Sequence, residues 1–255
     1  MGKITQNQLF WRRLIVQFRS LQVAVLTLAI STGLLVILSN FPVDAVLPEQ
    51  GRNSLPIIQK PHSLPPTLAQ WQDPTNSGDY FDQIKSTKVG YLIWSIFPIK
   101  VKIETPTNIS EKQSQLWVSS VLEAVQEWSI YLPLQIVKTS DIADIIIIRK
   151  APPLQLDPNR KILRARSALA SYDLYNFNNI LFHRFTILLS PSQTGDYVLS
   201  AARHELGHAL GIWGHSLLET DTMYFAQVRN PPLISARDVN TLKKVYEQST
   251  SLGHN

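Results

Sequence analysis

Residues 204–215 read His-Glu-Leu-Gly-His-Ala-Leu-Gly-Ile-Trp-Gly-His. On a helix, His204 and His208 are four residues apart and face the same side, where both imidazoles can reach one metal ion. Glu205 follows the first histidine, and a carboxylate there can accept a proton from a water molecule bound to the metal. The stretch therefore predicts a helix that carries two zinc ligands and a general base.

A third ligand is expected close behind this helix, because catalytic zinc usually takes three protein ligands and keeps one position open. His215 is the best candidate. Gly211 precedes it, and glycine readily adopts the left-handed conformation that ends a helix, so the chain can turn back beneath the metal. A methionine, Met223, follows eight residues after His215.

Together these residues resemble the signature of the metzincin metallopeptidases, His-Glu-x-x-His-x-x-Gly-x-x-His followed by a Met-turn. Asp221-Thr-Met-Tyr224 looks like the Met-turn, and its distance from His215 is the one expected in matrixins. The sequence departs from the family at one point. Three residues, 212–214, separate Gly211 from His215 where the family has two, so we expect a small bulge there.

The resemblance covers about residues 88–248 and implies an α+β fold: a mixed twisted sheet with an N-terminal helix, an active-site helix, a Met-turn and a C-terminal helix. It also implies a matrixin-like zinc metalloendopeptidase that acts on polypeptide substrates. Its Zn²⁺ would be held by His204, His208 and His215. Glu205 would activate the bound water, and Met223 would form an apolar floor beneath the metal.

Other readings of the same residues remain open at this point. In a gluzincin-like enzyme the third ligand would be a carboxylate such as Glu219 or Glu247. A membrane-anchored binding module that holds zinc without catalysis is a further alternative, favoured only by the displaced third histidine. His183 is expected to be structural, because the set of three histidines is complete without it.

The charge distribution argues against a nucleic-acid partner. The formal net charge is +5, but Lys3, Arg12, Arg13 and Arg19 all lie in the first twenty residues, which contain no Asp or Glu. The rest of the chain has 20 Lys and Arg against 19 Asp and Glu, so no excess of basic residues remains to bind nucleic acid. The chain has no cysteine, which excludes disulfides and thiolate ligands.

The N-terminal part predicts a membrane-directed segment. Residues 1–20 are basic and are expected in the cytoplasm, and residues 21–38 carry no charge. Residues 21–40 therefore predict a transmembrane anchor, or a signal segment cleaved near Val43-Asp-Ala45. The catalytic domain would lie outside the cytoplasm, anchored to the membrane or secreted after cleavage.

Residues 41–87 predict a linker or pro-segment, because they contain seven of the sixteen prolines among polar residues. His62 and Asp73 within it are expected to be exposed linker residues rather than ligands that block the zinc. The metallopeptidase domain is then assigned to residues 88–250.

Within that domain the hydrophobic pattern predicts the individual elements. A capping box at Ser110 and Gln113 opens a helix whose inward residues are Trp117, Val121, Val125 and Trp128. The basic residues of 150–165 are expected in a solvated loop, with a patch for anionic substrates as the alternative. Strands are expected at 101–104, 134–139, 144–149 (buried on both faces), 168–175 and 180–189, and the last two are expected to form a hairpin with its turn at 176–179. Further helices are expected at 196–210 and 235–246.

Overall fold

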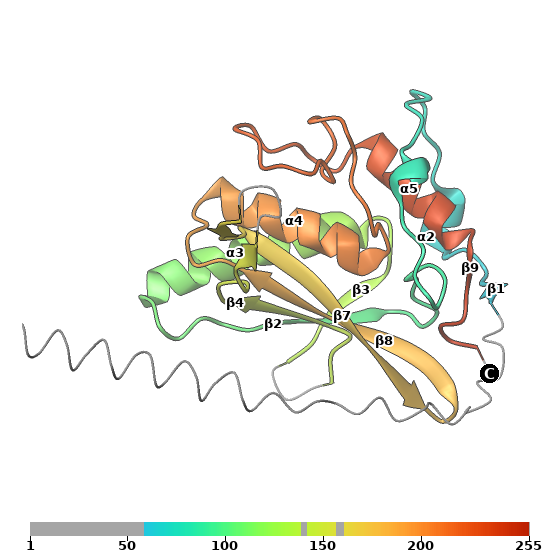
Figure 1. The fold of residues 1–255 in the computed structure, drawn as a ribbon, viewed down its shortest axis with the longest axis horizontal. Coiled ribbons are helices and arrows are strands. Elements are labelled where there is room, and N and C mark those ends of the chain that lie inside the picture. Colours follow the sequence, from blue (N-terminus) through green and yellow to red (C-terminus); the bar gives the residue numbers. More distant parts are fainter. Residues whose placement is uncertain (1–58, 139–141, 157–160, 255) are drawn as a thin grey trace, which may run out of the picture. The chain divides into compact units, whose positions relative to one another are not determined.

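The computed structural model of the protein describes residues 59–138, 142–156 and 161–254. In this part of the chain the fold is mixed α+β, with four helices and a five-stranded mixed sheet (Figure 1). In chain order the elements are β1 (Lys60–Pro61), α2 (Pro66–Gln70), a 3₁₀ helix (Phe81–Gln83), β2 (Ile99–Ile103), α3 (Glu111–Ser129), β3 (Leu134–Ile136), β4 (Ile145–Arg149), β5 (Gln155–Leu156), β6 (Leu163–Arg164), β7 (Ala168–Phe177), β8 (Ile180–Leu189), α4 (Asp196–Leu210), α5 (Ala236–Tyr246) and β9 (Ser249–Thr250).

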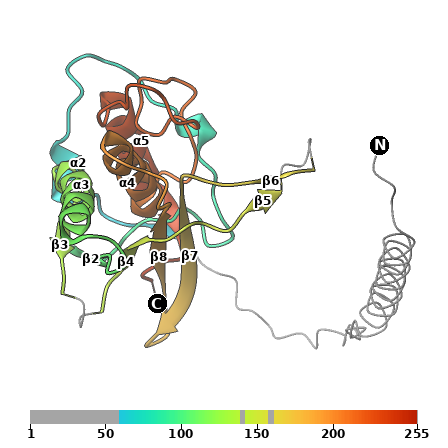
Figure 2. The same ribbon diagram turned by 90° about the vertical axis from the view of Figure 1, so that its left-hand side faces the viewer.

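The central sheet has the strand order β3-β2-β4-β8-β7. Its first four strands are parallel, whereas β7 runs antiparallel to β8 and lies at the edge. The tight turn of the predicted hairpin is made by Asn178 and Asn179, whose φ angles of 51° and 65° suit a two-residue hairpin connection. Strands β5 and β6 form a small separate ribbon that projects beside β7 (Figure 2).

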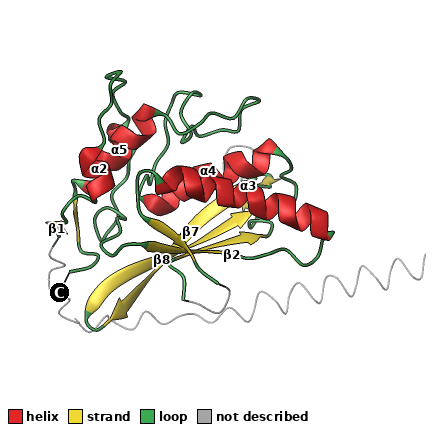
Figure 3. Ribbon diagram, turned by 180° about the vertical axis from the view of Figure 1, so that it is seen from behind, coloured by secondary structure: helices red, strands yellow, loops and turns green. Residues whose placement is uncertain are grey.

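Helices α3 and α4 pack against each other and cover one face of the sheet (Figure 3). The capping box predicted for α3 is confirmed: Ser110 Oγ accepts a hydrogen bond from Gln113 N, and the Gln113 side chain accepts one from Ser110 N. All four predicted inward residues of α3 are buried. Trp128 is the largest of them, and its indole Nε1 donates to the carbonyl of Arg203 on α4, which fixes the two helices to each other.

The prediction that β4 is buried on both faces is wrong. Ile145 and Ile147 are fully buried beneath the helices, but Ile146 and Ile148, which point to the other face, are only half-buried. A continuous run of isoleucines is typical of a strand that is covered on both faces, which is the basis of the prediction. Among the described residues, however, the helices that pack on the sheet cover only one face.

The domain begins earlier than the predicted boundary at residue 88. Residues 59–87 pack on the rest of the fold: Leu68 of α2 is fully buried, and Tyr80 is 3% exposed. The indole of Trp71 donates to Asn240 Oδ1 on α5 over 2.9 Å. This part of the predicted 41–87 linker is therefore integral to the domain, because its few apolar side chains fill positions in the common core.

Within the described ranges, no helix is both long enough and apolar enough to cross a membrane. The expected transmembrane helix is therefore not among the described helices. The segment that carries the expectation, residues 21–40, lies outside the described residues, as does the basic stretch 1–20.

Candidate metal centre and substrate cleft

Helix α4 carries the histidine motif and has the predicted bounds, Asp196–Leu210. Its inward side is anchored in the core through Ala202, Leu206 and Ala209, which are fully buried. Trp94 strengthens this anchoring, because its indole Nε1 donates to the carbonyl of Ala209 over 2.8 Å. The helix is thus a rigid platform from which His204, Glu205 and His208 extend.

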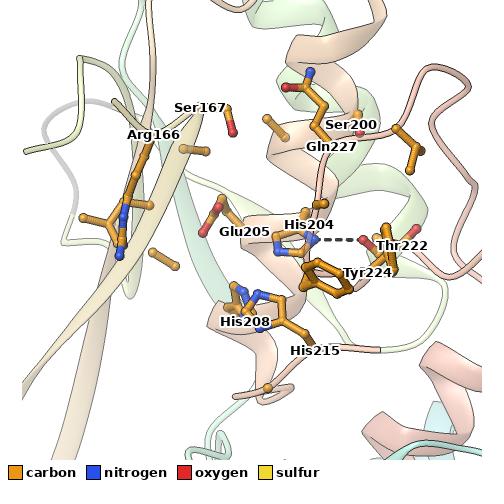
Figure 4. Close-up of a pocket in the computed structure, with 18 of the residues that line it drawn as sticks. Arg166, Ser167, Ser200, His204, Glu205, His208, His215, Thr222, Tyr224 and Gln227 are labelled. Atoms are coloured by element: carbon orange, nitrogen blue, oxygen red, sulfur yellow. Dashed lines mark hydrogen bonds between the residues drawn. The ribbon is translucent and has the colours of Figure 1, made fainter. Parts of the chain in front are cut away.

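The three predicted histidines converge at one end of this platform (Figure 4). The potential ligand atoms of His204, His208 and His215 all lie within 4.8 Å of one another. His208 is buried, His204 is half-buried and His215 is exposed, so the cluster opens towards solvent on one side. These residues could hold a metal ion and leave a position accessible to water or substrate.

Backbone carbonyls fix the orientation of the two helical imidazoles. His204 Nδ1 lies 2.9 Å from the carbonyl oxygen of Thr222, and His208 Nδ1 lies 2.8 Å from that of Ile212. A carbonyl can only accept, so each Nδ1 carries the proton and donates it. Each Nε2 then keeps its lone pair for a metal, which is the usual arrangement around metal-bound histidine.

The electrostatic surroundings favour neutral imidazoles. Burial lowers the pKa of His204 to about 4, and burial also holds the pKa of His208 well below its ordinary value. Burial lowers the pKa of His215 as well, with a further contribution from the positive charge of Lys85. Because a metal competes with protons for the same lone pairs, neutral histidines at pH 7 leave the cluster ready to bind a metal.

The extra residue before His215 is accommodated in a tight, well-packed loop. Gly211 ends α4 with a φ of 132°, and the next amide, Ile212 N, donates to the carbonyl of Gly207. The Trp213 side chain packs edge-on against Tyr172 and Phe185 of the sheet. The predicted bulge is therefore held in place by a large aromatic side chain.

The backbone of residues 83–85 holds the same loop from the other side. Ile84 forms a β-bridge with Gly214, and Lys85 N donates to the carbonyl of Trp213 over 3.1 Å. A Cβ atom at Gly214 would overlap the carbonyl oxygen of Gln83. Glycine is needed at position 214 because the backbone of residues 83–85 passes too close for a side chain. His215 is the next residue, so this close approach also fixes its position.

Gly214→Ala should therefore weaken metal binding and lower the melting temperature. The added methyl meets backbone atoms, which cannot rotate away, so residues 83–85 or 213–215 must shift, at a cost of about 1 to 3 kcal/mol. Zinc titration and thermal unfolding check this, with Thr220→Ala at an exposed position as control. Unchanged affinity and melting temperature in Gly214→Ala would show that the close approach does not position His215.

Met223 lies directly against α4, the helix that carries His204 and His208. Its side chain is fully buried, and a Cβ at Gly207 would overlap the Met223 sulfur. Gly207 sits between the two helical histidines, where glycine costs about 1 kcal/mol relative to alanine in a helix. The structure gives the reason for that glycine: it makes room for Met223 to pack beneath the cluster.

A buried aspartate holds the turn that contains Met223. Asp238 of α5 is fully buried and accepts hydrogen bonds from Thr222 N (2.9 Å) and Met223 N (3.3 Å). It also accepts one from Tyr80 Oη over 2.6 Å. These hydrogen bonds hold the turn in position, and the Thr222 carbonyl in this turn accepts the hydrogen bond from His204 Nδ1. Asp238 therefore positions the His204 side chain indirectly.

Glu205 lies next to the histidines and lines the same cleft (Figure 4). Its carboxyl is buried, and burial raises its pKa to about 7, although a backbone hydrogen bond from Ala170 of β7 and the charge of Arg166 act in the opposite direction. A carboxyl with a pKa near neutrality can both accept and return a proton at pH 7. This is the property that a general base beside a metal requires.

The cluster lies in a cleft of about 1030 Å³. One wall is α4. The opposite wall is formed by residues 164–170, which include the last residue of β6 and the first residues of the edge strand β7. The loop 222–228 borders the remaining side. The outer edge of β7 pairs with no strand among the described residues. The cleft therefore exposes backbone donors and acceptors of a strand beside Glu205.

The other residues considered as ligands lie elsewhere. His183 is buried against Trp94, with ring centroids 4.0 Å apart, and is not part of the cluster, as predicted. The Nε2 atom of His62 lies 2.7 Å from the carbonyl oxygen of Leu252. Asp73 accepts hydrogen bonds from the backbone amide of Ser77 and from the side chain of Asn240. In the described part of the chain, no carboxylate belongs to the group of possible ligands that the three histidines form. Glu219 and Glu247, the alternative third ligands, therefore lie outside it.

Sequence reasoning missed three supporting residues. Tyr80 lies in the segment interpreted as a linker, and Asp238 lies in the first turn of the predicted helix 235–246. Arg203, next to His204, is 3% exposed and donates to both oxygens of Glu127 and to the carbonyl of Pro232. A charged residue on the buried side of α4 was the available signal, because a buried guanidinium requires such partners.

Comparisons with known proteins give no family assignment. A scan against protein-family models found no family that matches the chain, and a search of curated proteins found no matching relative. The functional argument therefore depends on the residues of the cleft themselves.

Proposed function

We propose that the protein is a zinc-dependent metalloendopeptidase of metzincin type, similar to matrixins. The observation that carries this proposal is the convergence of three histidines beside a buried carboxyl in an open cleft. The three histidines supply the ligands and Glu205 the general base, which together are the minimum set for metal-assisted hydrolysis.

Zinc is the metal that the donor set fits best. Imidazole nitrogen suits zinc, and catalytic zinc sites often have three protein ligands and one open position. His204 and His208 also have the carbonyl partners on Nδ1 that orient metal ligands. When bound, zinc supplies a water molecule of lowered pKa and polarises the carbonyl of the scissile bond.

Glu205 then moves the protons. Its carboxylate would accept the proton of the attacking water and return it to the leaving amine. The backbone amide of Ala170 restrains the carboxyl on the β7 side. Met223 contributes packing beneath the histidines and no ligand atom.

A polypeptide substrate is supported by the position of β7. An extended peptide can add to an open strand edge through main-chain hydrogen bonds, and the first residues of β7 line the cleft next to Glu205. A peptide bound in this way would pass its carbonyl groups close to the histidines. Such a surface serves a chain of many residues better than a small compact ligand.

The metzincin assignment has its own support. Helix α3, the motif helix α4, the turn with Met223 and helix α5 follow one another along the chain in the order that the resemblance implies, with a mixed sheet beside them. The one-residue departure is absorbed by the loop around Trp213. The carboxylates that the gluzincin-like alternative would use, Glu219 and Glu247, do not join the three histidines.

Purified full-length protein should bind about one equivalent of zinc and cleave casein. Treatment with 1,10-phenanthroline should abolish cleavage, and added zinc should restore it, because a metal with three ligands can be removed and replaced. Metal analysis and the release of casein fragments check the two parts. Casein cleavage that persists in the metal-free protein would contradict the proposal.

A further inference from the structure

We propose that the cleft selects polypeptides with acidic side chains next to the bond to be cleaved, and that Arg166 and Lys85 provide this selectivity. The inference rests on the proposed function, since it assigns a substrate class to the same cleft. It starts from the charges that line the cleft on either side of the histidine cluster.

The described lining of the cleft is strongly unbalanced in charge. Its basic residues are Lys85, Arg164 and Arg166, whereas Glu205 is its only carboxylate. Glu205 is assigned to proton transfer, and a bound divalent cation would add two further positive charges. Clefts lined by charge of one sign concentrate ligands of the opposite sign, because low-dielectric walls focus the field.

Arg166 is held in position by a neutral partner. It lies two residues before β7 and is half-buried, and its Nε and Nη2 both donate to the side-chain oxygen of Gln155 (2.8 Å for Nε). Among the described residues it forms no ion pair, so the amide orients the guanidinium without neutralising it. Figure 4 shows Arg166 on the strand side of the cleft and Glu205 on the helix side.

Lys85 lies at the other end of the cluster. Its backbone is fixed next to the His215 loop by the hydrogen bond from Lys85 N to the Trp213 carbonyl. The side chain is exposed, and its charge acts on His215. An extended peptide that crosses the histidines would therefore meet one cation near Glu205 and another near His215.

This arrangement distinguishes the two readings of the basic stretch 150–165 and its neighbours. A solvated loop would turn its charges away from the site, whereas Arg164 and Arg166 line the cleft. A fixed guanidinium binds carboxylates with directed hydrogen bonds, and a basic side chain of the substrate would be repelled at the same place. The cleft thus contains both an attractive and a repulsive element of specificity.

The test compares equal-length peptides of one extended sequence that differ only in having Asp, Asn or Lys at the central positions, and the cleaved bond is mapped in each peptide. The zinc-loaded full chain should cleave Asp peptides with a kcat/KM about tenfold or more above that of Lys peptides, a difference that should shrink at high salt. Arg166→Gln and Lys85→Gln should each reduce the ratio, and Arg166→Glu should reverse it. Lys112→Glu, with the same change of charge at an exposed position on α3 outside the cleft, should leave it unchanged.

Binding of the same peptides to zinc-loaded Glu205→Gln, followed by fluorescence anisotropy, separates this inference from the proposed function. Preferential binding of Asp peptides without cleavage by the wild type would support the inference and refute the peptidase assignment. Cleavage without preference for acidic peptides, or a preference that survives Arg166→Glu, would overturn the inference and leave the peptidase intact. Absence of binding to any of the peptides would overturn it as well.

Discussion

Glu205→Gln should bind zinc as the wild type does and lose about 10² to 10⁴-fold in kcat, since general base catalysis contributes a factor of that size. The amide has nearly the shape of the carboxylate, so the packing beside Ala170 should persist. It cannot accept the proton of the attacking water. Casein or peptide cleavage, measured with zinc content and melting temperature on the same preparation, checks the expectation.

The matched control is Glu219→Gln, which changes an exposed carboxylate in the loop that follows His215. It should retain full activity and full zinc content. Wild-type activity in Glu205→Gln would exclude the proposed proton transfer. Loss of zinc together with activity in that variant would instead make Glu205 a ligand.

His215→Ala should lower zinc affinity by more than about 100-fold, because even the partners behind metal ligands change affinity by 10 to 100-fold and a direct ligand contributes more. Two histidines would remain on α4. The side chain of His215 is exposed, so its loss should scarcely affect the melting temperature of the metal-free protein. Competition with a chromophoric chelator measures the affinity.

His183→Ala is the informative comparison, because its expected effects are the opposite. The ring is 3% exposed and packs on Trp94 and Phe185, so its removal leaves a cavity and should lower the melting temperature. Zinc affinity should stay close to that of the wild type. Equal losses of zinc affinity in the two variants would show that His215 has no special role.

The motif helix and its flanks could be predicted because local rules and tertiary packing agree there. Asp196–Leu210, the capping box at Ser110 and the hairpin turn at Asn178 depend on spacing, caps and turn residues that act within a few positions. The convergence of His215 with the helical histidines was predictable from Gly211 for the same reason. Each signal lies close in sequence to the feature that it predicts.

Contacts distant in sequence could not be predicted in this way. The segment that contains Tyr80 has the composition of a linker, and its role appears only where it meets Asp238, 158 residues away. The position of Lys85 next to the His215 loop could not be predicted either, because it depends on a contact with Trp213. The position of Arg166 on the cleft wall depends on the pairing of β7 with β8. Composition reports what a segment can bury and says little about where it packs.

The insertion before His215 shows how the two kinds of information combine. The spacing alone predicts a bulge, and deletion of Trp213 would restore the family spacing. The structure shows that this residue packs against Tyr172 and Phe185 and that its carbonyl accepts from Lys85. The longer loop is thus supported by its own contacts, and its removal would cost packing that the shorter loop does not replace.

The central claim is that His204, His208 and His215 together hold a catalytic zinc ion. Anomalous diffraction at the zinc edge from crystals of the zinc-loaded protein tests it most directly. The account predicts one zinc peak bonded to a nitrogen of each histidine at about 2.0 to 2.1 Å, with Glu205 outside the bonding distance. Zinc bound by His204, His208 and a carboxylate, with His215 turned to solvent, would contradict it.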